Sequence, residues 1–123
     1  MKKLILATLL VSLIACSSDD SNIIEDLFIP NVSNQWESDR NTTFFFNPAK
    51  TNVNESDFTG SEQGSNESFE LSGHFKNYDI TFTFSEGPED GVKYTGKFIK
   101  GSNPLTIKVT GTNGEKIEIK QKL

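Results

Sequence analysis

The chain has 123 residues, 34% of them hydrophobic and 24% charged, which suits one small domain with a modest core and excludes a multidomain enzyme. Twelve basic against seventeen acidic residues give a net charge of −5. This balance disfavours nucleic-acid binding, which needs a basic footprint to displace the counterions of the phosphate backbone. One Cys and one His leave little material for a catalytic or metal-binding centre.

The first fifteen residues have the features of a secretory signal peptide. Lys2 and Lys3 form a basic start, and residues 4–15 are an apolar run interrupted only by Thr8 and Ser12. A helix of this length measures about 18 Å, whereas the hydrocarbon core of a bilayer is about 30 Å thick. We therefore predict that the run directs export and is then removed, because it is too short to remain as a membrane span.

The only cysteine of the chain follows this run directly. Leu13-Ile14-Ala15-Cys16 resembles the lipobox of bacterial lipoproteins, in which the Cys sulfur receives a diacylglycerol and the chain is cleaved before the Cys. The resemblance implies a lipid anchor on Cys16, and several acyl chains hold a protein on a membrane far more firmly than one. The alternative is an incidental thiol in an ordinary signal peptide. One cysteine forms no disulfide within the chain, so packing alone must stabilise the exported domain.

Residues 16–33 are predicted to be a lipidated, flexible tether. Ser17, Ser18, Asp19 and Asp20 follow the cysteine, and this acidic, serine-rich start resembles the surface-export signal of lipoproteins of the Bacteroidota. The resemblance implies a location on the outer membrane with exposure at the cell surface. The same composition also suits a simple hydrophilic spacer, because it offers nothing to bury. Both interpretations are compatible.

After the tether the pattern favours β-strands. From Phe69 onward apolar and polar residues alternate with period two, and no apolar stripe of helical spacing of useful length occurs. Five strands are predicted at roughly 67–76, 78–85, 91–100, 103–111 and 115–122. Weaker candidates, in which Ser, Asn and Glu interrupt the alternation, lie at 34–40, 42–48 and 53–62.

The turns are constrained because a register shift of one residue would move every core side chain to the wrong face. The turns that keep the apolar residues together are Lys76-Asn77, a loop centred on Gly87-Pro88-Glu89, Gly101-Ser102, and the three-residue loop Thr112-Asn113-Gly114 with Gly114 in the left-handed region. They predict three rows across the five strands: Leu71, Phe82, Tyr94, Val109 and Ile117; Gly73, Ile80, Gly96, Ile107 and Ile119; Phe75, Tyr78, Phe98, Leu105 and Gln121.

Glycines in the middle row and charges on the other face support this sheet. Gly73 and Gly96 are predicted to flank Ile80, where small side chains permit the strong coiling found at barrel corners. The opposite face is polar and is expected to hold two pairs of opposite charge, Asp79 with Lys97 and Lys108 with Glu118.

A sheet with one apolar face needs a cover. We expect it from Trp36, Phe44, Phe45, Phe46 and Phe58. The predicted fold is therefore all-β, an antiparallel meander that closes over residues 34–123 as an eight-stranded up-and-down barrel, with a β-sandwich as the alternative. Asn34-Gln35-Trp36 followed by a meander resembles small lipocalin-like and avidin-like barrels, although Asn34 stands where those barrels have Gly.

Residues suited to catalysis are sparse. His74 is predicted on the polar face opposite Asp79, and without a Cys or a convincing Ser nucleophile to accompany it we interpret it as a surface residue. We interpret two carboxylate pairs as solvated residues of tether and turn rather than acid/base pairs: Glu25-Asp26 and Glu89-Asp90. No spacing matches a calcium loop or a zinc site. We expect no catalytic residue, no metal and no cofactor.

Three function classes follow, in order of preference. The first is a non-catalytic binding or accessory module on the envelope that holds a protein or a surface glycan. The second is a lipocalin-like carrier of a small apolar ligand, and an enzyme ranks third. Fifteen large apolar side chains point inward from the last five predicted strands, and eight strands enclose room only for side chains or one small ligand. A filled barrel favours the module over the carrier.

Overall fold

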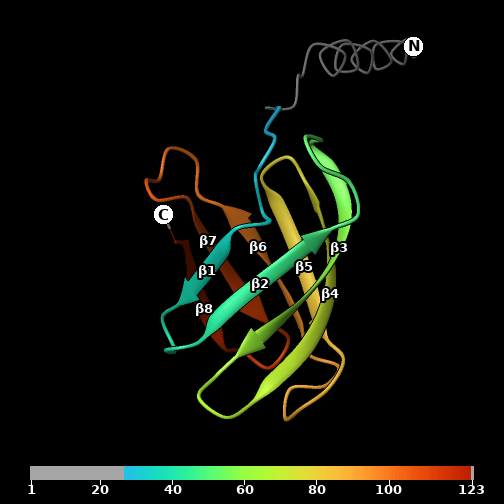
Figure 1. Cartoon of the computed structure of the whole chain (residues 1–123), viewed down its shortest axis with the longest axis vertical. Helices are drawn as coiled ribbons and strands as arrows, with labels where there is room; N and C mark the ends of the chain where they lie inside the picture. Colours follow the sequence, from blue (N-terminus) through green and yellow to red (C-terminus); the bar gives the residue numbers. More distant parts are fainter. Residues whose placement is uncertain (1–26, 123) are drawn as a thin grey trace, which may run out of the picture.

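The computed structural model describes residues 27–122, which form a closed barrel of eight antiparallel strands (Figure 1). The predicted signal peptide, Cys16 and the export residues Ser17, Ser18, Asp19 and Asp20 lie outside the described residues. Within 27–122 no helix is long and apolar enough to cross a membrane. The strands are β1 (Gln35–Ser38), β2 (Thr43–Pro48), β3 (Glu55–Gln63), β4 (Ser68–Lys76), β5 (Asp79–Phe84), β6 (Lys93–Phe98), β7 (Thr106–Gly111) and β8 (Lys116–Gln121).

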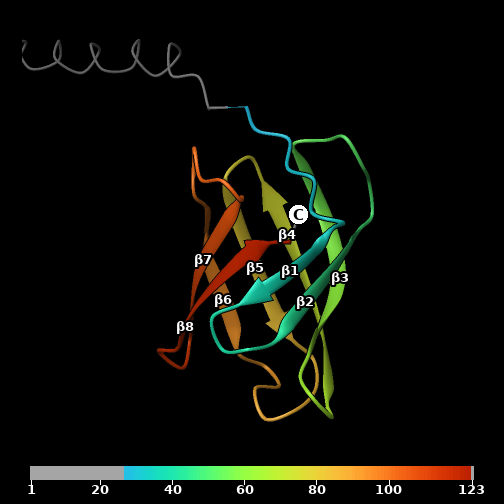
Figure 2. The same cartoon turned by 60° about the vertical axis from the view of Figure 1, so that its left-hand side comes forward.

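The prediction of an all-β up-and-down barrel is confirmed. Each strand pairs with the next one along the chain, and β1 also pairs with β8, which closes the sheet (Figure 2). Alternation along each strand directs every second side chain into the barrel. In β5, for example, Ile80, Phe82 and Phe84 are buried, whereas Thr81 and Thr83 between them are half-exposed. All fifteen residues predicted to point inward belong to the core or pack against it.

Two of the four predicted turns are confirmed. β5 and β6 pair Phe82 with Tyr94, and β7 and β8 pair Val109 with Ile117 across a loop in which Gly114 has a φ of 86°. Glycine occupies this left-handed conformation without the steric cost that a Cβ would add.

The β4–β5 turn is displaced from its predicted position. The turn residues are Asn77 and Tyr78 rather than Lys76 and Asn77, and Lys76 pairs with Asp79. Asn77 has a φ of 53°, a conformation that asparagine tolerates better than most residues. Because the displacement shifts the register by two residues, the apolar side chains stay on the inner face.

The β6–β7 connection is also longer than the predicted Gly101-Ser102 turn. It spans residues 99–105, and Phe98 pairs with Ile107 instead of Leu105. The Ile99 amide donates to the Thr106 carbonyl at 2.7 Å. The register again differs by two, which leaves the inner face unchanged.

These shifts separate the two glycines that were predicted to share a row. Gly73 lies opposite Phe82, whereas Gly96 lies between Ile80 and Val109. A Cβ on Gly96 would overlap the Lys108 carbonyl oxygen and approach the Val109 Cα to 2.7 Å. Gly96 therefore allows the backbone of β7 to approach β6 closely.

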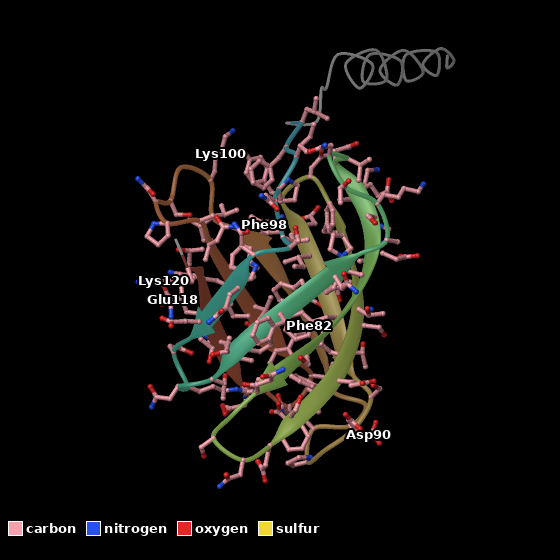
Figure 3. All side chains as sticks on the ribbon, in the orientation of Figure 1. Phe82, Asp90, Phe98, Lys100, Glu118 and Lys120 are labelled. Atoms are coloured by element: carbon pink, nitrogen blue, oxygen red, sulfur yellow. The ribbon has the colours of Figure 1, made fainter. Side chains whose placement is uncertain are left out.

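Trp36, Phe44, Phe46 and Phe58 are buried, as the predicted cover requires, but Phe45 is 38% exposed. The prediction for Phe45 is wrong because neighbouring residues in an extended strand point to opposite faces. Figure 3 shows the side chains on the barrel, with Phe82 labelled in its interior.

Residues 27–34 cover one end of the barrel, which we call the closed end. Phe28 stacks on Tyr78 with ring centroids 4.2 Å apart, and its amide donates to the Asn77 Oδ1 at 3.2 Å. Val32 is buried, and its carbonyl accepts a 3.0 Å hydrogen bond from the Trp36 Nε1. Packing onto the barrel thus begins before residue 34, the predicted start of the barrel domain, because Phe28 and Val32 supply apolar surface.

Candidate functional site

The opposite end of the barrel contains a pocket of about 330 Å³, which we call the distal pocket. It lies among the β1–β2, β3–β4 and β5–β6 loops, at the end of the barrel away from residue 27 (Figure 1). Its apolar lining consists of Phe69, Phe84 and Pro88. Its charged lining consists of Arg40, Glu62, Glu67, Glu86 and Glu89.

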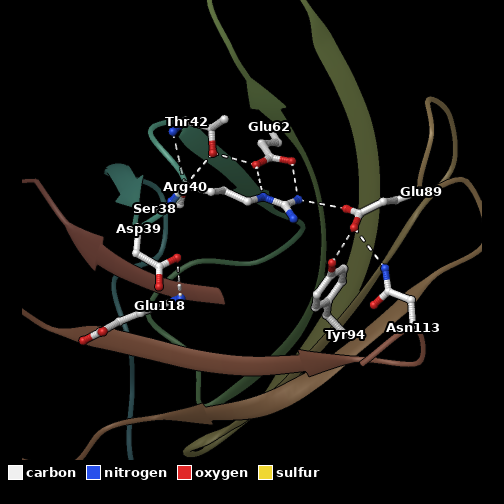
Figure 4. A network of polar contacts seen from close by, with 9 residues as sticks. All are labelled: Ser38, Asp39, Arg40, Thr42, Glu62, Glu89, Tyr94, Asn113 and Glu118. Atoms are coloured by element: carbon white, nitrogen blue, oxygen red, sulfur yellow. Dashed lines mark hydrogen bonds and ion pairs between the residues drawn. The ribbon is translucent and has the colours of Figure 1, made fainter. Parts of the chain in front are cut away.

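Arg40 connects two sides of this pocket through hydrogen bonds (Figure 4). It follows β1, and its Nε and Nη2 donate to the two carboxylate oxygens of Glu62, each at 2.7 Å. Nη2 also donates to the Glu89 Oε1 at 2.8 Å. Burial alone would lower the pKa of Arg40, but the hydrogen bonds and charges of Glu62 and Glu89 outweigh it, so the net shift is upward. The guanidinium is therefore charged at neutral pH.

Both carboxylate oxygens of Glu62 accept hydrogen bonds, and the residue is only 5% exposed. Besides both contacts with Arg40, its Oε2 accepts a 2.6 Å hydrogen bond from the Thr42 hydroxyl. A buried carboxylate is tolerated when such partners replace its water. This contact set joins the end of β3 to the β1–β2 turn.

Glu89 links the β5–β6 loop to two further elements. Its Oε2 accepts hydrogen bonds from the Tyr94 hydroxyl at 2.7 Å and from the Asn113 amide at 3.1 Å (Figure 4). Burial alone would raise the pKa of Glu89, but the hydrogen bonds from Arg40 and Tyr94 and the Arg40 charge hold it below 4.5. Burial, and then the contact with Glu89, raise the pKa of the Tyr94 phenol above 10.0. Glu89 is thus an anchored anion at neutral pH.

Four carboxylates and one guanidinium line the distal pocket beside an apolar floor, which gives the lining a formal net charge of −3. The remaining polar side chain of its lining is Thr42, whose hydroxyl donates to Glu62.

His74 lies elsewhere, on the outer wall of the barrel. The register places it opposite Thr81, not Asp79 as predicted, because the β4–β5 turn is displaced. Its Nδ1 is 2.7 Å from the Asp57 Oδ1 and its Nε2 is 2.9 Å from the Glu55 Oε2. The hydrogen bond to Asp57 is the main cause that raises the pKa of His74 above 6.5, and it outweighs a small opposing effect of burial.

The His74 side chain is 42% exposed, which agrees with its interpretation as a surface residue. Within residues 27–122 no group of three or more His, Cys, Asp or Glu could hold a metal ion. The two pairs of opposite charge predicted on the outer face are also confirmed. Asp79 and Lys97 form an ion pair, and Lys108 lies opposite Glu118.

The interpretation of Glu89 as a solvated turn residue is wrong, because its side chain is 20% exposed and bound by three partners. Arg40 and Glu62 were not singled out from the sequence. A signal for Glu62 was present, since it continues the inward phase of Phe58 and Gly60 along β3. A carboxylate in that phase requires a cationic partner, and Arg40 is the only arginine of the chain.

Comparisons with protein-family models, with curated proteins and with solved structures found no match to this chain.

Proposed function

We propose that this protein is a lipoprotein anchored on the outer membrane and exposed at the cell surface. There it acts as a non-catalytic binding or accessory module, and the distal pocket is its binding site. The observation that supports this proposal is the placement of the pocket. Leu27, eleven residues after Cys16, lies at the closed end, and the loops that line the distal pocket lie at the other end (Figure 1). A lipid on Cys16 would leave the pocket facing away from the membrane.

The filled interior supports a module rather than a carrier. Trp36, Phe44 and Tyr94 have no exposed surface, and aromatic rings contact one another along the barrel, for example Phe82 with Tyr94 at 5.4 Å between centroids. A lipocalin-like carrier of a small apolar ligand, the alternative function, would need space among these rings. The partner of the module is a protein or glycan of the envelope.

Photo-crosslinking in living cells tests the binding function. A photoreactive amino acid replaces Ser65, an exposed residue of the β3–β4 turn beside the distal pocket, and in a control chain it replaces Thr51, an exposed residue of the β2–β3 loop at the closed end. We expect one discrete adduct from position 65 and none from position 51. Equal adducts from both positions, or none from position 65, would contradict the proposal.

Metabolic labelling with a clickable fatty acid tests the anchor. We expect the native chain to be labelled and to fractionate with membranes, and the Cys16→Ala chain to lose both properties. Label retained by the Cys16→Ala chain would overturn the lipoprotein assignment.

Protease treatment of intact cells tests the export signal. Changing Asp19 and Asp20 to Asn should leave lipidation intact and reduce exposure at the cell surface, because the acidic pair is proposed to act as an export address. Unchanged protease accessibility would mean that the pair is only part of a spacer.

A further inference from the structure

We propose that the distal pocket binds an alkylammonium or guanidinium group on a short hydrocarbon stem, the chemistry of a lysine or arginine side chain. This inference rests on the proposed binding function and names the ligand of the same site.

The charge of the pocket selects a cation. Arg40 is the only cation among the lining residues, and Glu62 and Glu89 already occupy its guanidinium through three hydrogen bonds. Glu67 and Glu86 add two further carboxylates with no second guanidinium among the lining residues. Opposite charges attract more strongly at a partly dehydrated surface than in bulk water. A cation entering the pocket is therefore stabilised and an anion is repelled.

The floor of the pocket selects a hydrocarbon stem. Phe84 is buried, and Phe69 packs against the core. Gly87, with a φ of 86°, lies so close to Phe69 that a Cβ would come within 2.7 Å of the ring. Lysine and arginine lay their methylene stems along such surfaces and keep their charged ends beside polar groups. Aromatic faces also attract cations.

The walls of the pocket are held in place before a ligand arrives. Glu62 and Glu89 come from β3 and from the β5–β6 loop, and Arg40 binds both. Tyr94 and Asn113 fix the second oxygen of Glu89. A site that is already ordered avoids the entropy cost of arranging its side chains upon binding. Arg40 is in this sense a positioning residue.

The size of the pocket limits what enters. A volume of about 330 Å³ lies at the lower end of the range for ligand pockets, about 300–1,000 Å³. It suits one side chain or a small amine.

A titration with capped amino acids tests the proposal on the Cys16→Ala chain without residues 1–15, which retains every described strand and the whole described core. The ligands are N-acetyl amides of lysine, arginine, norleucine and glutamate, and the readout is amide chemical shifts in NMR spectra. We expect the lysine and arginine compounds to shift signals of Phe69, Phe84 and Glu86. Norleucine, which keeps the stem and lacks the charge, and glutamate should shift none.

A pair of matched double variants tests whether the carboxylates of the distal pocket are responsible for lysine binding. Glu67→Gln with Glu86→Gln removes two negative charges from the pocket and should weaken lysine binding at least about tenfold, which corresponds to about 1.4 kcal/mol. Glu37→Gln with Asp79→Asn removes the same charge from exposed ion pairs on the outer wall and should leave binding unchanged. Dispersed amide spectra verify that both variants fold. Binding of norleucine equal to that of lysine, or an equal loss in both variants, would overturn the proposal.

The two possible sources of the cation are distinguished by one further pair of ligands. Tighter binding of a lysine-containing peptide than of 1,5-diaminopentane identifies a partner protein, and the reverse order identifies a free amine. An adduct from position 65 in cells without lysine binding in vitro would refute this inference and keep the binding function. Lysine binding without an adduct would keep this inference and contradict a protein or glycan of the envelope as the partner.

Discussion

At the closed end, Phe28, Val32 and Trp36 seal the barrel with apolar contacts, whereas at the other end Arg40 and its carboxylates border an open pocket. Apolar burial contributes stability that does not depend on pH. An ion-paired network loses in desolvation much of what its attraction contributes. The closed end therefore contributes apolar stabilisation to the fold, whereas the distal end holds charged groups in a fixed arrangement.

Charges differ between the two ends as well. Figure 3 shows Lys100 beside the closed end and Asp90 at the distal end. Lys50 lies with Ile29 at the closed end, and four carboxylates line the distal pocket. A ligand approaching the distal end therefore meets a negative surface, which favours the encounter of cations.

The largest expected effect is at the closed end. Trp36→Ala removes a side chain with no exposed surface, its contacts with the rings of Phe46 and Phe98 and its hydrogen bond to the Val32 carbonyl. Deletions of this size cost about 3–5 kcal/mol. Urea denaturation followed by circular dichroism measures the loss. Phe45→Ala, at an exposed ring of similar size, should cost less than about 1 kcal/mol; equal losses would mean that the closed end does not hold the fold.

Gly96→Val tests how tightly β6 and β7 pack in the wall of the barrel between its two ends. Overpacking costs about 1–3 kcal/mol, and the added Cβ also overlaps the backbone of β7, so we expect a loss of more than about 2 kcal/mol. Thr95→Val, one residue away on the outer face, should change the free energy of unfolding by less than about 1 kcal/mol. A neutral Gly96→Val would reveal spare room in the interior and place the small-ligand carrier ahead of the binding module.

Arg40→Met tests whether the distal network contributes to stability. The substitution keeps an unbranched stem, removes the guanidinium and leaves Glu62 without its cationic partner, and an unpaired buried group costs about 1–3 kcal/mol. Lys97→Met breaks the exposed ion pair with Asp79 and should cost less than about 1 kcal/mol. Urea unfolding at pH 7 measures both variants. An Arg40→Met loss no larger than that of Lys97→Met would show that the network adds nothing to the folded state.

The smallest expected effects are changes of the free energy of unfolding with pH, which run in opposite directions for Glu89 and His74. The folded pKa of Glu89 is lowered, so its contribution is present above pH 4.5 and is lost as pH falls through the folded value. The folded pKa of His74 is raised, so its contribution is complete below pH 6.5 and is lost as pH rises through the folded value. Urea midpoints from acid to alkaline pH record both. His74→Asn should abolish the decline above pH 6.5, and a decline that persists would assign it to another group.

Period-two alternation predicted β4 to β8 and their inner face, because a barrel of this size is built from that pattern. It predicted β1 to β3 only weakly, because polar residues interrupt the alternation there, and Phe45 was assigned to the wrong face. It did not settle the β4–β5 and β6–β7 turns, because a shift of two residues leaves every side chain on the same face. The tolerance of Asn77 for a left-handed φ of 53° settled the first of them. Arg40, Glu62 and Glu89 lie far apart in sequence, and only closure of the barrel brings them together.

Closure of the barrel depends on the short pairing between β1 and β8. β1 has four residues and joins β8 through three pairs of residues, among them Trp36 with Gln121. All other strand pairs of the barrel connect neighbours along the chain. Without β1, the backbones of β2 and β8 would become two unprotected sheet edges, and such edges recruit further chains. The four residues of β1 therefore also cover both of these edges, and we expect a truncation that removes them to expose the edges and promote aggregation.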